Sequence, residues 1–366
     1  MTYLDYQATT PLAPEALAAM LPWLESQHAN PHSAHREGRR ARAAVETARD
    51  QVAALLPSGG RVAFTSGATE ALNWAIKGST GAIVTLSTEH AAVLDTVAAV
   101  GTGPGARDVN VLPVGADGRI DPDVARRAIR PGLVAAMLVN NEIGVIQPIA
   151  ALADAAHDAG ALLLCDAVQG YGRVAIPDEV DLVAISAHKI HGPKGIGALW
   201  IRDGVALAPL LHGGGQEAPG RSGTLSPALC AGFGMAARLM VDRRDADAAH
   251  VDRLWTLAVE RLGPGWVING ATGGGAVANR YHGNLNVRRD GLDVNRLMSD
   301  LRDIAFSAGS ACASGSGRSS HVLRAIGLSE TQARSSIRLG FGRYTGEAEL
   351  RDAVDAIAAA ARTQWP

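Results

Sequence analysis

The chain has 366 residues, of which 47% are hydrophobic, so it can bury a large core and is long for one compact unit. We therefore expect one large domain and one smaller domain. Its 34 Lys and Arg residues nearly balance its 36 Asp and Glu residues, and no basic stripe occurs, which argues against direct nucleic-acid binding. The N-terminal sequence lacks the pattern of a secretory signal and no long apolar run follows, so we expect a cytoplasmic protein without a membrane segment.

The three cysteines, Cys165, Cys230 and Cys312, lie far apart and lack the spacing of a zinc site. We therefore expect free thiols and no metal site. Cys165 and Cys230 stand in apolar sequence and are predicted to be buried small side chains.

The next feature is an alternation of helical and strand-like patterns. Apolar positions recur at helical spacing over 36–56 and stop at a Pro-Ser-Gly-Gly sequence, which predicts an amphipathic helix with a defined end. Short apolar runs of strand length then occur at 61–66, 82–87, 133–140, 161–166, 180–186 and 197–201. Helical stretches separate most of them, for example 89–101 and 148–160. This pattern predicts an α/β domain with a mainly parallel central sheet and flanking helices.

From about Asp245 a charged helix, a Gly-rich turn and a Ser-rich segment predict a smaller α+β domain.

Polar residues follow five of the expected strands. Ligands of open α/β sheets bind beyond the carboxyl ends of the strands, so these residues are the first candidates for a site. They are Ser66, Gly67, Ala68 and Thr69, then His90, then Asn140 and Asn141, then Asp166 and Gln169, and finally Ser186, Ala187, His188 and Lys189.

The helix expected to start near Ala68 and Thr69 has two interpretations. Backbone N–H groups at such a helix start, aided by the helix dipole, form a site for an anion such as a phosphate. However, Ser or Thr followed by Glu is also the pattern of ordinary helix capping. Taken alone, this segment favours capping.

Asp166 and Lys189 point more strongly to chemistry. A carboxylate directly after an apolar strand needs a partner that compensates its buried charge. This partner can be a cofactor nitrogen, an arginine, or the backbone N–H groups of a following helix that the carboxylate caps. A lysine in the sequence SAHKIHGPKG, directly after another such strand, is poorly placed to be a solvated surface charge. Desolvated lysines form Schiff bases. A lysine for an aldehyde, an aspartate for a pyridinium nitrogen and a helix start for a phosphate are together the arrangement that pyridoxal 5'-phosphate (PLP) requires.

Cys312 stands in the segment 307–320, SAGSACASGSGRSS, which is composed almost entirely of Ser, Gly and Ala. Such a segment has little apolar surface to bury and predicts a mobile loop. Two interpretations are a linker with an incidental cysteine and a loop that carries a reactive thiol.

Motifs along nearly the whole chain resemble those of cysteine desulfurases, which are PLP-dependent enzymes of aminotransferase class V with fold type I. The resembling segments are YLDYQATTP (3–11), NPHSAH (30–35), FTSGATEALNWAIKG (64–78), TEHAAVLDT (88–96), VNNEIGVIQPI (139–149), CDAVQGYG (165–172), SAHKIHGPKGIGALW (186–200), HGGGQEAPGRSGT (212–224), SAGSACAS (307–314) and SSIRLGFGRYT (335–345). The form of the cysteine loop resembles group I of these enzymes, which serve iron–sulfur cluster assembly.

The resemblance implies a role for most of the candidate residues. Lys189 would form the Schiff base with PLP, and Asp166 would pair with the pyridine nitrogen. His90 would stack on the ring, and Gln169 would hydrogen-bond its phenolic oxygen. The groups implied to hold the phosphate are the backbone at Ala68, the side chains of Thr69, Ser186 and His188, and Thr224 reaching in from the other subunit of a homodimer.

The resemblance also implies the reaction. Asn141 and Arg338 would bind the carboxylate of L-cysteine, and Cys312 would take its sulfur as a persulfide while L-alanine leaves. A Gly/Ser/Ala loop would let Cys312 carry the sulfur to an acceptor protein. Four destinations stay open, namely iron–sulfur clusters, tRNA thiolation, DNA phosphorothioation and cofactor synthesis.

Other functions stay open as alternatives. A class V transaminase or a selenocysteine lyase would share Lys189 and Asp166, and a PLP-binding protein without catalysis could act as a regulator or scaffold. On the desulfurase hypothesis, residues 15–244 form the large PLP-binding domain. Residues 1–14 and 245–366 form the small domain, which carries the cysteine loop at 307–320.

Overall fold

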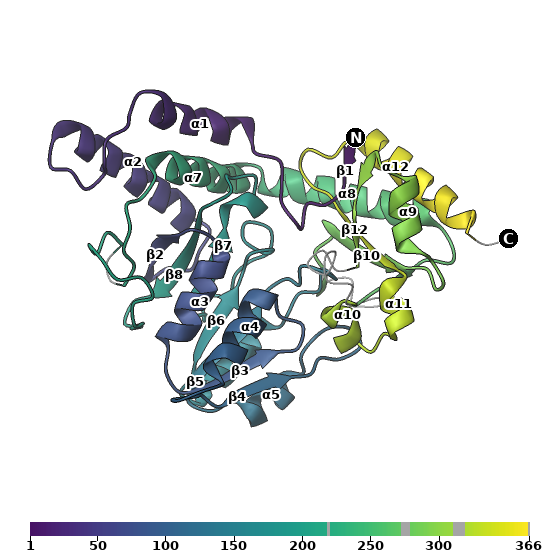
Figure 1. Ribbon diagram of the computed structural model, residues 1–366, viewed down its shortest axis with the longest axis horizontal. Coiled ribbons are helices and arrows are strands. Elements are labelled where there is room, and N and C mark those ends of the chain that lie inside the picture. The colour runs from purple at the N-terminus through teal and green to yellow at the C-terminus, as the bar shows by residue number, and fades with distance from the viewer. Residues whose placement is uncertain (218–219, 272–278, 310–318, 365–366) are drawn as a thin grey trace.

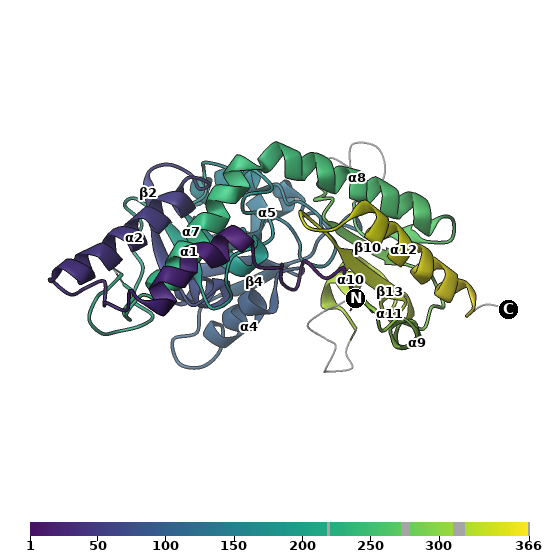
Figure 2. The ribbon, with the colours of Figure 1, turned by 90° about the horizontal axis from the view of Figure 1, so that it is seen from above.

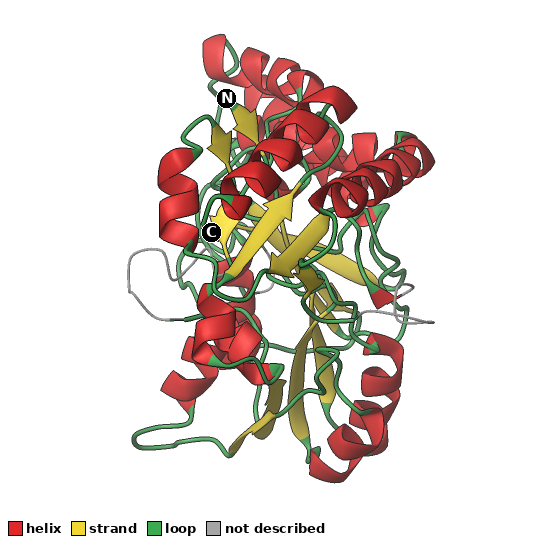
Figure 3. Cartoon of the chain, turned by 90° about the vertical axis from the view of Figure 1, so that its right-hand side faces the viewer, coloured by secondary structure: helices red, strands yellow, loops and turns green. Residues whose placement is uncertain are grey.

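The computed structural model describes residues 1–217, 220–271, 279–309 and 319–364 (Figure 1). Its largest element is a sheet of seven strands, and strands lie in the interior with helices around them (Figure 3). In spatial order these strands are β2 (Gly60–Thr65), β8 (Gly197–Arg202), β7 (Leu182–Ser186), β6 (Leu162–Asp166), β5 (Gly132–Met137), β3 (Ala82–Leu86) and β4 (Val109–Leu112). The neighbours from β7 to β4 run parallel, and β8 is antiparallel to both β7 and β2. The predicted α/β fold with a mainly parallel central sheet is therefore confirmed.

Helices cover both faces of the central sheet. Side chains of successive strand residues point to opposite faces, so that Leu133 and Ala135 belong to one apolar cluster and Val134 and Ala136 to another. The first face is covered by α3 (Ala68–Gly78) and α4 (Ala91–Val100). The second face is covered by α2 (Arg36–Ala53), α5 (Pro122–Ala128), α6 (Ile149–Asp158) and α7 (Pro227–Asp242). Helix α1 (Pro14–Glu25) packs on α7. These two layers explain why the central strands read as continuous apolar runs.

The C-terminal part is built around a second, smaller sheet. Its strands, in spatial order, are β12 (Ser307–Ala308), β13 (Ser336–Gly340), β10 (Asn284–Arg288) and β9 (Val267–Ile268). The helices around it are α8 (Arg244–Leu262), α9 (Val294–Asp300), α10 (His321–Ala325), α11 (Glu330–Arg334) and α12 (Glu347–Arg362). Helix α8 follows α7 almost directly and leads from the central sheet to this part of the molecule (Figure 2). The predicted α+β character of the C-terminal part is therefore observed.

The N-terminus joins the C-terminal part rather than the central sheet. Strand β1 (Thr2–Tyr3) pairs in parallel with β11 (Ile304–Ala305), and Leu4 is completely buried in the apolar cluster formed by α8, α12 and the smaller sheet. We propose the division into a domain of residues 15–244 and a domain of residues 1–14 and 245–366. The separate apolar clusters on either side of this division support it.

No helix in the described part of the chain combines the length and the apolar character needed to cross a lipid bilayer.

Candidate active site

A cavity of about 660 Å³ lies beyond the carboxyl ends of the central strands, where the N-terminal segment and β13 close over them. It brings together ten of the residues that the sequence singled out. They are Ala68, Thr69, His90, Asn141, Asp166, Gln169, Ser186, His188, Lys189 and Arg338. Thr224 is exposed and does not line this cavity, and Cys312 lies outside the described residues. The cavity has the size of an ordinary cofactor or substrate pocket.

Lys189 enters the cavity from the short 3-10 helix η1 (Ala187–Lys189), which directly follows β7. Its Nζ donates hydrogen bonds to the backbone carbonyls of Gln7 and Ala8, the latter at 3.0 Å. Burial, aided by the nearby Arg338 and Arg173 guanidinium groups, lowers the pKa of Lys189 to about 8. The uncharged, nucleophilic form of this amine is therefore much more populated near neutral pH than it is in a solvated lysine.

Asp166 is the last residue of β6 and is only 6% exposed. Its Oδ1 accepts a hydrogen bond of 3.0 Å from the Val168 backbone N–H, and within the described chain no Lys or Arg lies at ion-pair distance from it. Burial raises the pKa of Asp166, and the bond from Val168 opposes this rise. Asp166 therefore caps the turn that follows β6 and is not paired with an arginine among the described residues. This single neutral bond leaves its charge without a cationic partner, and a cationic ligand nitrogen fits this carboxylate.

Two histidines of the cavity are held as neutral rings. His90 precedes α4, and its Nδ1 accepts from the Ala92 backbone N–H at 3.1 Å. The Nδ1 of His188 lies 3.1 Å from the hydroxyl of Thr9. Burial lowers the pKa of both, that of His188 to about 4 with help from the Lys189 and Lys194 charges. A neutral ring can stack on an aromatic cofactor or donate a hydrogen bond to a phosphate without carrying a charge.

The start of α3, with Gly67, Ala68 and Thr69, lines the cavity. The N-cap position is Gly67, and no side chain caps the helix there. Glu70, which could have served a capping pattern, instead accepts from the Ser66 backbone N–H at 2.8 Å and pairs with Arg221 at 2.9 Å. A Cβ added at Gly67 would meet no atom of a neighbouring group within 4 Å. The geometry therefore favours the anion-site interpretation over simple capping.

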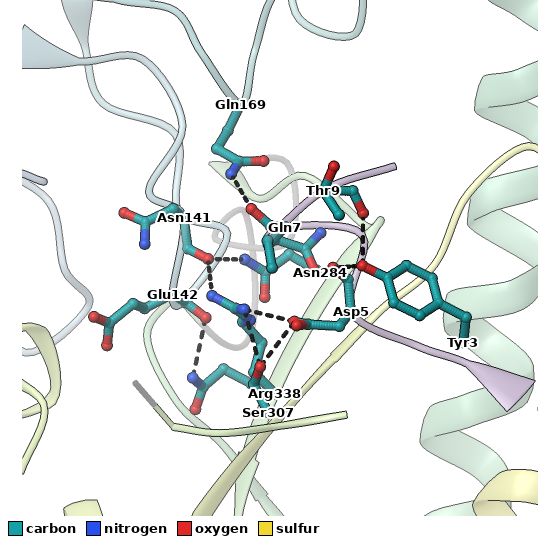
Figure 4. Close-up of polar contacts among 12 residues, drawn as sticks. Tyr3, Asp5, Gln7, Thr9, Asn141, Glu142, Gln169, Asn284, Ser307 and Arg338 are labelled. Carbon is teal, nitrogen blue, oxygen red and sulfur yellow. Dashed lines mark hydrogen bonds and ion pairs between the residues drawn. The ribbon is translucent and has the colours of Figure 1, made fainter. Parts of the chain in front are cut away.

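Arg338 comes from β13 of the smaller sheet, lines the cavity and is only 1% exposed. Its Nη1 donates to the backbone carbonyl of Asn141 at 3.0 Å, and its Nη2 donates to Asp5 Oδ1 at 2.7 Å (Figure 4). The neighbouring Asn140 has a different task, because its Oδ1 accepts from two following backbone N–H groups and its Nδ2 donates to the Thr88 carbonyl. The structure thus assigns Asn140 to the turn and Asn141 to the cavity wall.

The sequence prediction missed the N-terminal segment as a part of this site. Gln7, Ala8 and Thr9 all line the cavity. The Gln7 carbonyl accepts from both Lys189 and Gln169, the latter at 2.9 Å, and Thr9 contacts His188. The one available signal was that YLDYQATTP resembles a family motif, since this short segment carries no helical or strand periodicity.

The residues around the cavity fit PLP. The uncapped α3 start suits a phosphate, Asp166 suits a pyridinium nitrogen, and the Lys189 amine suits an aldehyde. Gln169 also points to a bound ligand. Its Oε1 is buried without a partner among the described residues, and its Nε2 keeps one N–H that can donate to a ligand.

The two described cysteines have another role. Cys165 and Cys230 are free and completely buried, as predicted. Burial raises the pKa of both thiols, that of Cys230 to about 12. Both are therefore inert members of the core.

Comparison with known proteins agrees with this site. The family model for aminotransferase class-V matches residues 2–352. The chain is 41% identical to the cysteine desulfurase IscS of Rickettsia bellii, over 97% of this chain and 90% of that protein. It is 44% identical to the mitochondrial cysteine desulfurase of Eremothecium gossypii, over 97% of this chain and 75% of that protein.

Solved structures give the same result. A NifS-like protein superposes with a TM-score of 0.88 at 30% identity, covering 98% of both chains. A structure of SspA in complex with cysteine superposes with a TM-score of 0.82 at 33% identity, covering 94% of this chain and all of that one. This chain therefore belongs to the aminotransferase class-V family and, within it, to the cysteine desulfurases.

Proposed function

We propose that this protein uses PLP to convert L-cysteine to L-alanine and transfers the sulfur to Cys312. The observation that carries this proposal is the convergence of Lys189, Asp166 and Arg338 on one cavity beside the uncapped start of α3. The membership of the cysteine desulfurases and the complex of the related SspA with cysteine support the choice of substrate.

The proposed contacts to PLP divide between the two ends of the cofactor. Lys189 would bind the aldehyde, Asp166 the ring nitrogen and Gln169 the phenolic oxygen, with His90 against the ring. The phosphate would lie at the start of α3, where the Ala68 backbone and the side chains of Thr69, Ser186 and His188 line the cavity. Bound PLP supplies an electron sink that makes the bonds at the substrate's amino-bearing carbon and its neighbour easier to break.

The chain's own groups would bind and reprotonate the substrate. Arg338, together with the side chain of Asn141, would fix the carboxylate of L-cysteine, because a guanidinium group matches a planar anion with two parallel donors. The Lys189 Nζ, with its lowered pKa, can accept and return a proton near pH 8. Holding the substrate at both ends leaves its thiol as the group that a second nucleophile can reach.

The sulfur-transfer step rests on the resemblance, because Cys312 lies outside the described residues. The Cys312 thiolate attacks the substrate sulfur, so that a sulfur–sulfur bond forms while the carbon–sulfur bond breaks. The carbon takes up a proton and leaves as L-alanine, and Cys312 keeps the sulfur as a persulfide. An acceptor protein then receives this sulfur.

A homodimer is part of the proposal. Thr224 is exposed and lies away from the cavity of its own chain. Its implied contact with the phosphate would therefore be made across a subunit interface.

The test of the function is the release of L-alanine from L-cysteine by the purified protein with PLP. We expect Lys189→Ala to abolish alanine formation, because the attachment point and the proton carrier are both lost. Lys77→Ala is the matched control, since Lys77 is an exposed lysine in the last turn of α3, and it should keep the wild-type rate. Absence of alanine with the wild-type protein, or an undiminished rate with Lys189→Ala, would reject the proposal.

A further inference from the structure

We propose that Asp5 is a positioning residue that holds the Arg338 guanidinium in the orientation that receives the carboxylate of the substrate. This inference rests on the proposed function, because it takes the substrate-binding role of Arg338 as given. It adds to the site a residue of the N-terminal segment that lies 333 positions away in the sequence.

The first argument is electrostatic. Arg338 is almost completely buried, and a buried guanidinium is costly unless an opposite charge and hydrogen bonds accompany it. Asp5 supplies the opposite charge, with its Oδ1 2.7 Å from Arg338 Nη2. The hydroxyl of Ser307 donates to the same Oδ1 at 2.8 Å and accepts from Nη2 at 3.3 Å. Asp5, Ser307 and Arg338 thus form a closed triangle of hydrogen bonds (Figure 4).

The second argument is that the guanidinium is held from two sides. Opposite Asp5, the Asn141 carbonyl accepts from Arg338 Nη1, and this carbonyl is itself fixed by Asn284 Nδ2 at 3.1 Å. Arg338 makes three hydrogen bonds in this way, one from Nη1 and two from Nη2. Its Nε has no partner among the described residues. The side chain therefore cannot swing freely, yet it keeps donors for a carboxylate.

The third argument is that Asp5 acts through Arg338 and not on the substrate. Asp5 is absent from the residues that line the described cavity, whereas Arg338 is present. The main chain of Asp5 is fixed by Tyr3, whose hydroxyl shares its one proton between the Thr9 carbonyl at 2.9 Å and the Asp5 carbonyl at 3.2 Å. The same short segment supplies the carbonyls that hold Lys189. Asp5 thereby sets the position of the carboxylate-binding group relative to the amine.

The expected effect is a loss of substrate affinity that depends on the carboxylate. Asp5→Asn keeps the shape of the side chain and removes its charge, so we expect KM for L-cysteine to rise by about tenfold and kcat to stay within about twofold. Competitive inhibition by L-alanine, which has a carboxylate, should weaken in parallel. Inhibition by cysteamine, which lacks a carboxylate, should stay unchanged. Asp5→Glu should recover part of the affinity.

The decisive experiment is a double-mutant cycle with Arg338→Ala. If Asp5 acts through Arg338, adding Asp5→Asn to Arg338→Ala should raise KM no further. Leu12→Ala is the control for a change in the same segment, because Leu12 is exposed and does not line the cavity, and it should leave KM near the wild-type value. Ser307→Ala tests the same triangle should Asp5→Asn fail to fold, and it should raise KM in the same direction.

The contradicting results separate this inference from the proposed function. If Asp5→Asn raises KM by the same factor in the wild-type and Arg338→Ala backgrounds, the positioning role alone is overturned. The same holds if Asp5→Asn weakens inhibition by cysteamine as much as inhibition by L-alanine. A rise in KM with Arg338→Ala but not with Asp5→Asn or Ser307→Ala would do the same. An unchanged KM with Arg338→Ala would reject the proposed role of Arg338 and this inference with it, while alanine formation by the wild type would still stand.

Discussion

Lys189 owes its proposed reactivity to its surroundings. It is the burial of the side chain, with Arg338 and Arg173 nearby, that makes the charged form costly. The Nζ has only the carbonyl oxygens of Gln7 and Ala8 as recorded partners among the described residues, and neither carries a full charge. The sequence predicted a desolvated lysine from the apolar strand before it. The carbonyl partners could not be predicted, because they come from a distant segment.

A pH dependence follows from the lowered pKa of Lys189. Capture of the PLP aldehyde by the cofactor-free protein requires the uncharged amine, which accumulates as pH rises through about 8 rather than through 10.5. The capture rate, followed by absorbance in a stopped-flow instrument, should therefore rise with pH and level off above about 8. Arg338→Gln removes a neighbouring positive charge and should move the midpoint upward. A wild-type midpoint near the usual pKa of lysine would contradict this account.

At the scale of elements, the strands with apolar side chains on both faces were predictable, including the edge strand β2, whereas the partly exposed edge strand β4 was not. Strands β2, β6 and β7 match the expected runs because both of their faces are covered by helices. Strand β4 (Val109–Leu112) was missed because it lies at the edge of the sheet, where Asn110 and Val111 are exposed and the apolar signal is lost. Helix α3 was expected, but only the structure shows that no side chain caps its start. Sequence alone could not choose between a cap and an anion site.

The start of α3 leads to a prediction about cofactor affinity. In Gly67→Ala the added methyl group meets no neighbouring protein atom, so the melting temperature of the cofactor-free protein should not change. The methyl group would occupy space beside the proposed phosphate site, and we expect Kd for PLP to rise by about tenfold. Lys77→Ala, on the same helix but away from the cavity, is the control. Unchanged PLP affinity in a titration of Gly67→Ala would argue against a phosphate at this helix start.

At the scale of the whole molecule, the site joins parts of the chain that are far apart in sequence. The N-terminal segment runs from its pairing with β11 past the end of β13 to the cavity, so that Asp5 meets Arg338 and Gln7 meets Lys189. Hydrophobic periodicity could predict the two sets of elements, since each builds its own apolar cluster. It could not predict a segment that is held by backbone carbonyls and single side chains.

The proposed homodimer predicts complementation between two defective chains. Lys189→Ala removes the amine, and Thr224→Glu should weaken phosphate binding by charge repulsion in the partner's site. If each site takes Lys189 from one chain and Thr224 from the other, a mixed dimer holds one intact site, and an equal mixture should recover about a quarter of the wild-type activity. Thr224→Ser is the control and should stay active alone. Failure of the exchanged mixture to recover activity would contradict the contact across subunits.

The most direct test of the account is a single turnover of the PLP-loaded protein with L-cysteine, followed by mass spectrometry of the peptide that contains Cys312. The account predicts that this peptide gains one sulfur atom, that a thiol reductant reverses the gain, and that one L-alanine forms for each modified Cys312. Cys312→Ala, Cys165→Ala and Cys230→Ala should separate the carrier from the buried thiols, and only the first should abolish the sulfur gain. L-Alanine formed with an unmodified Cys312 would contradict the central claim.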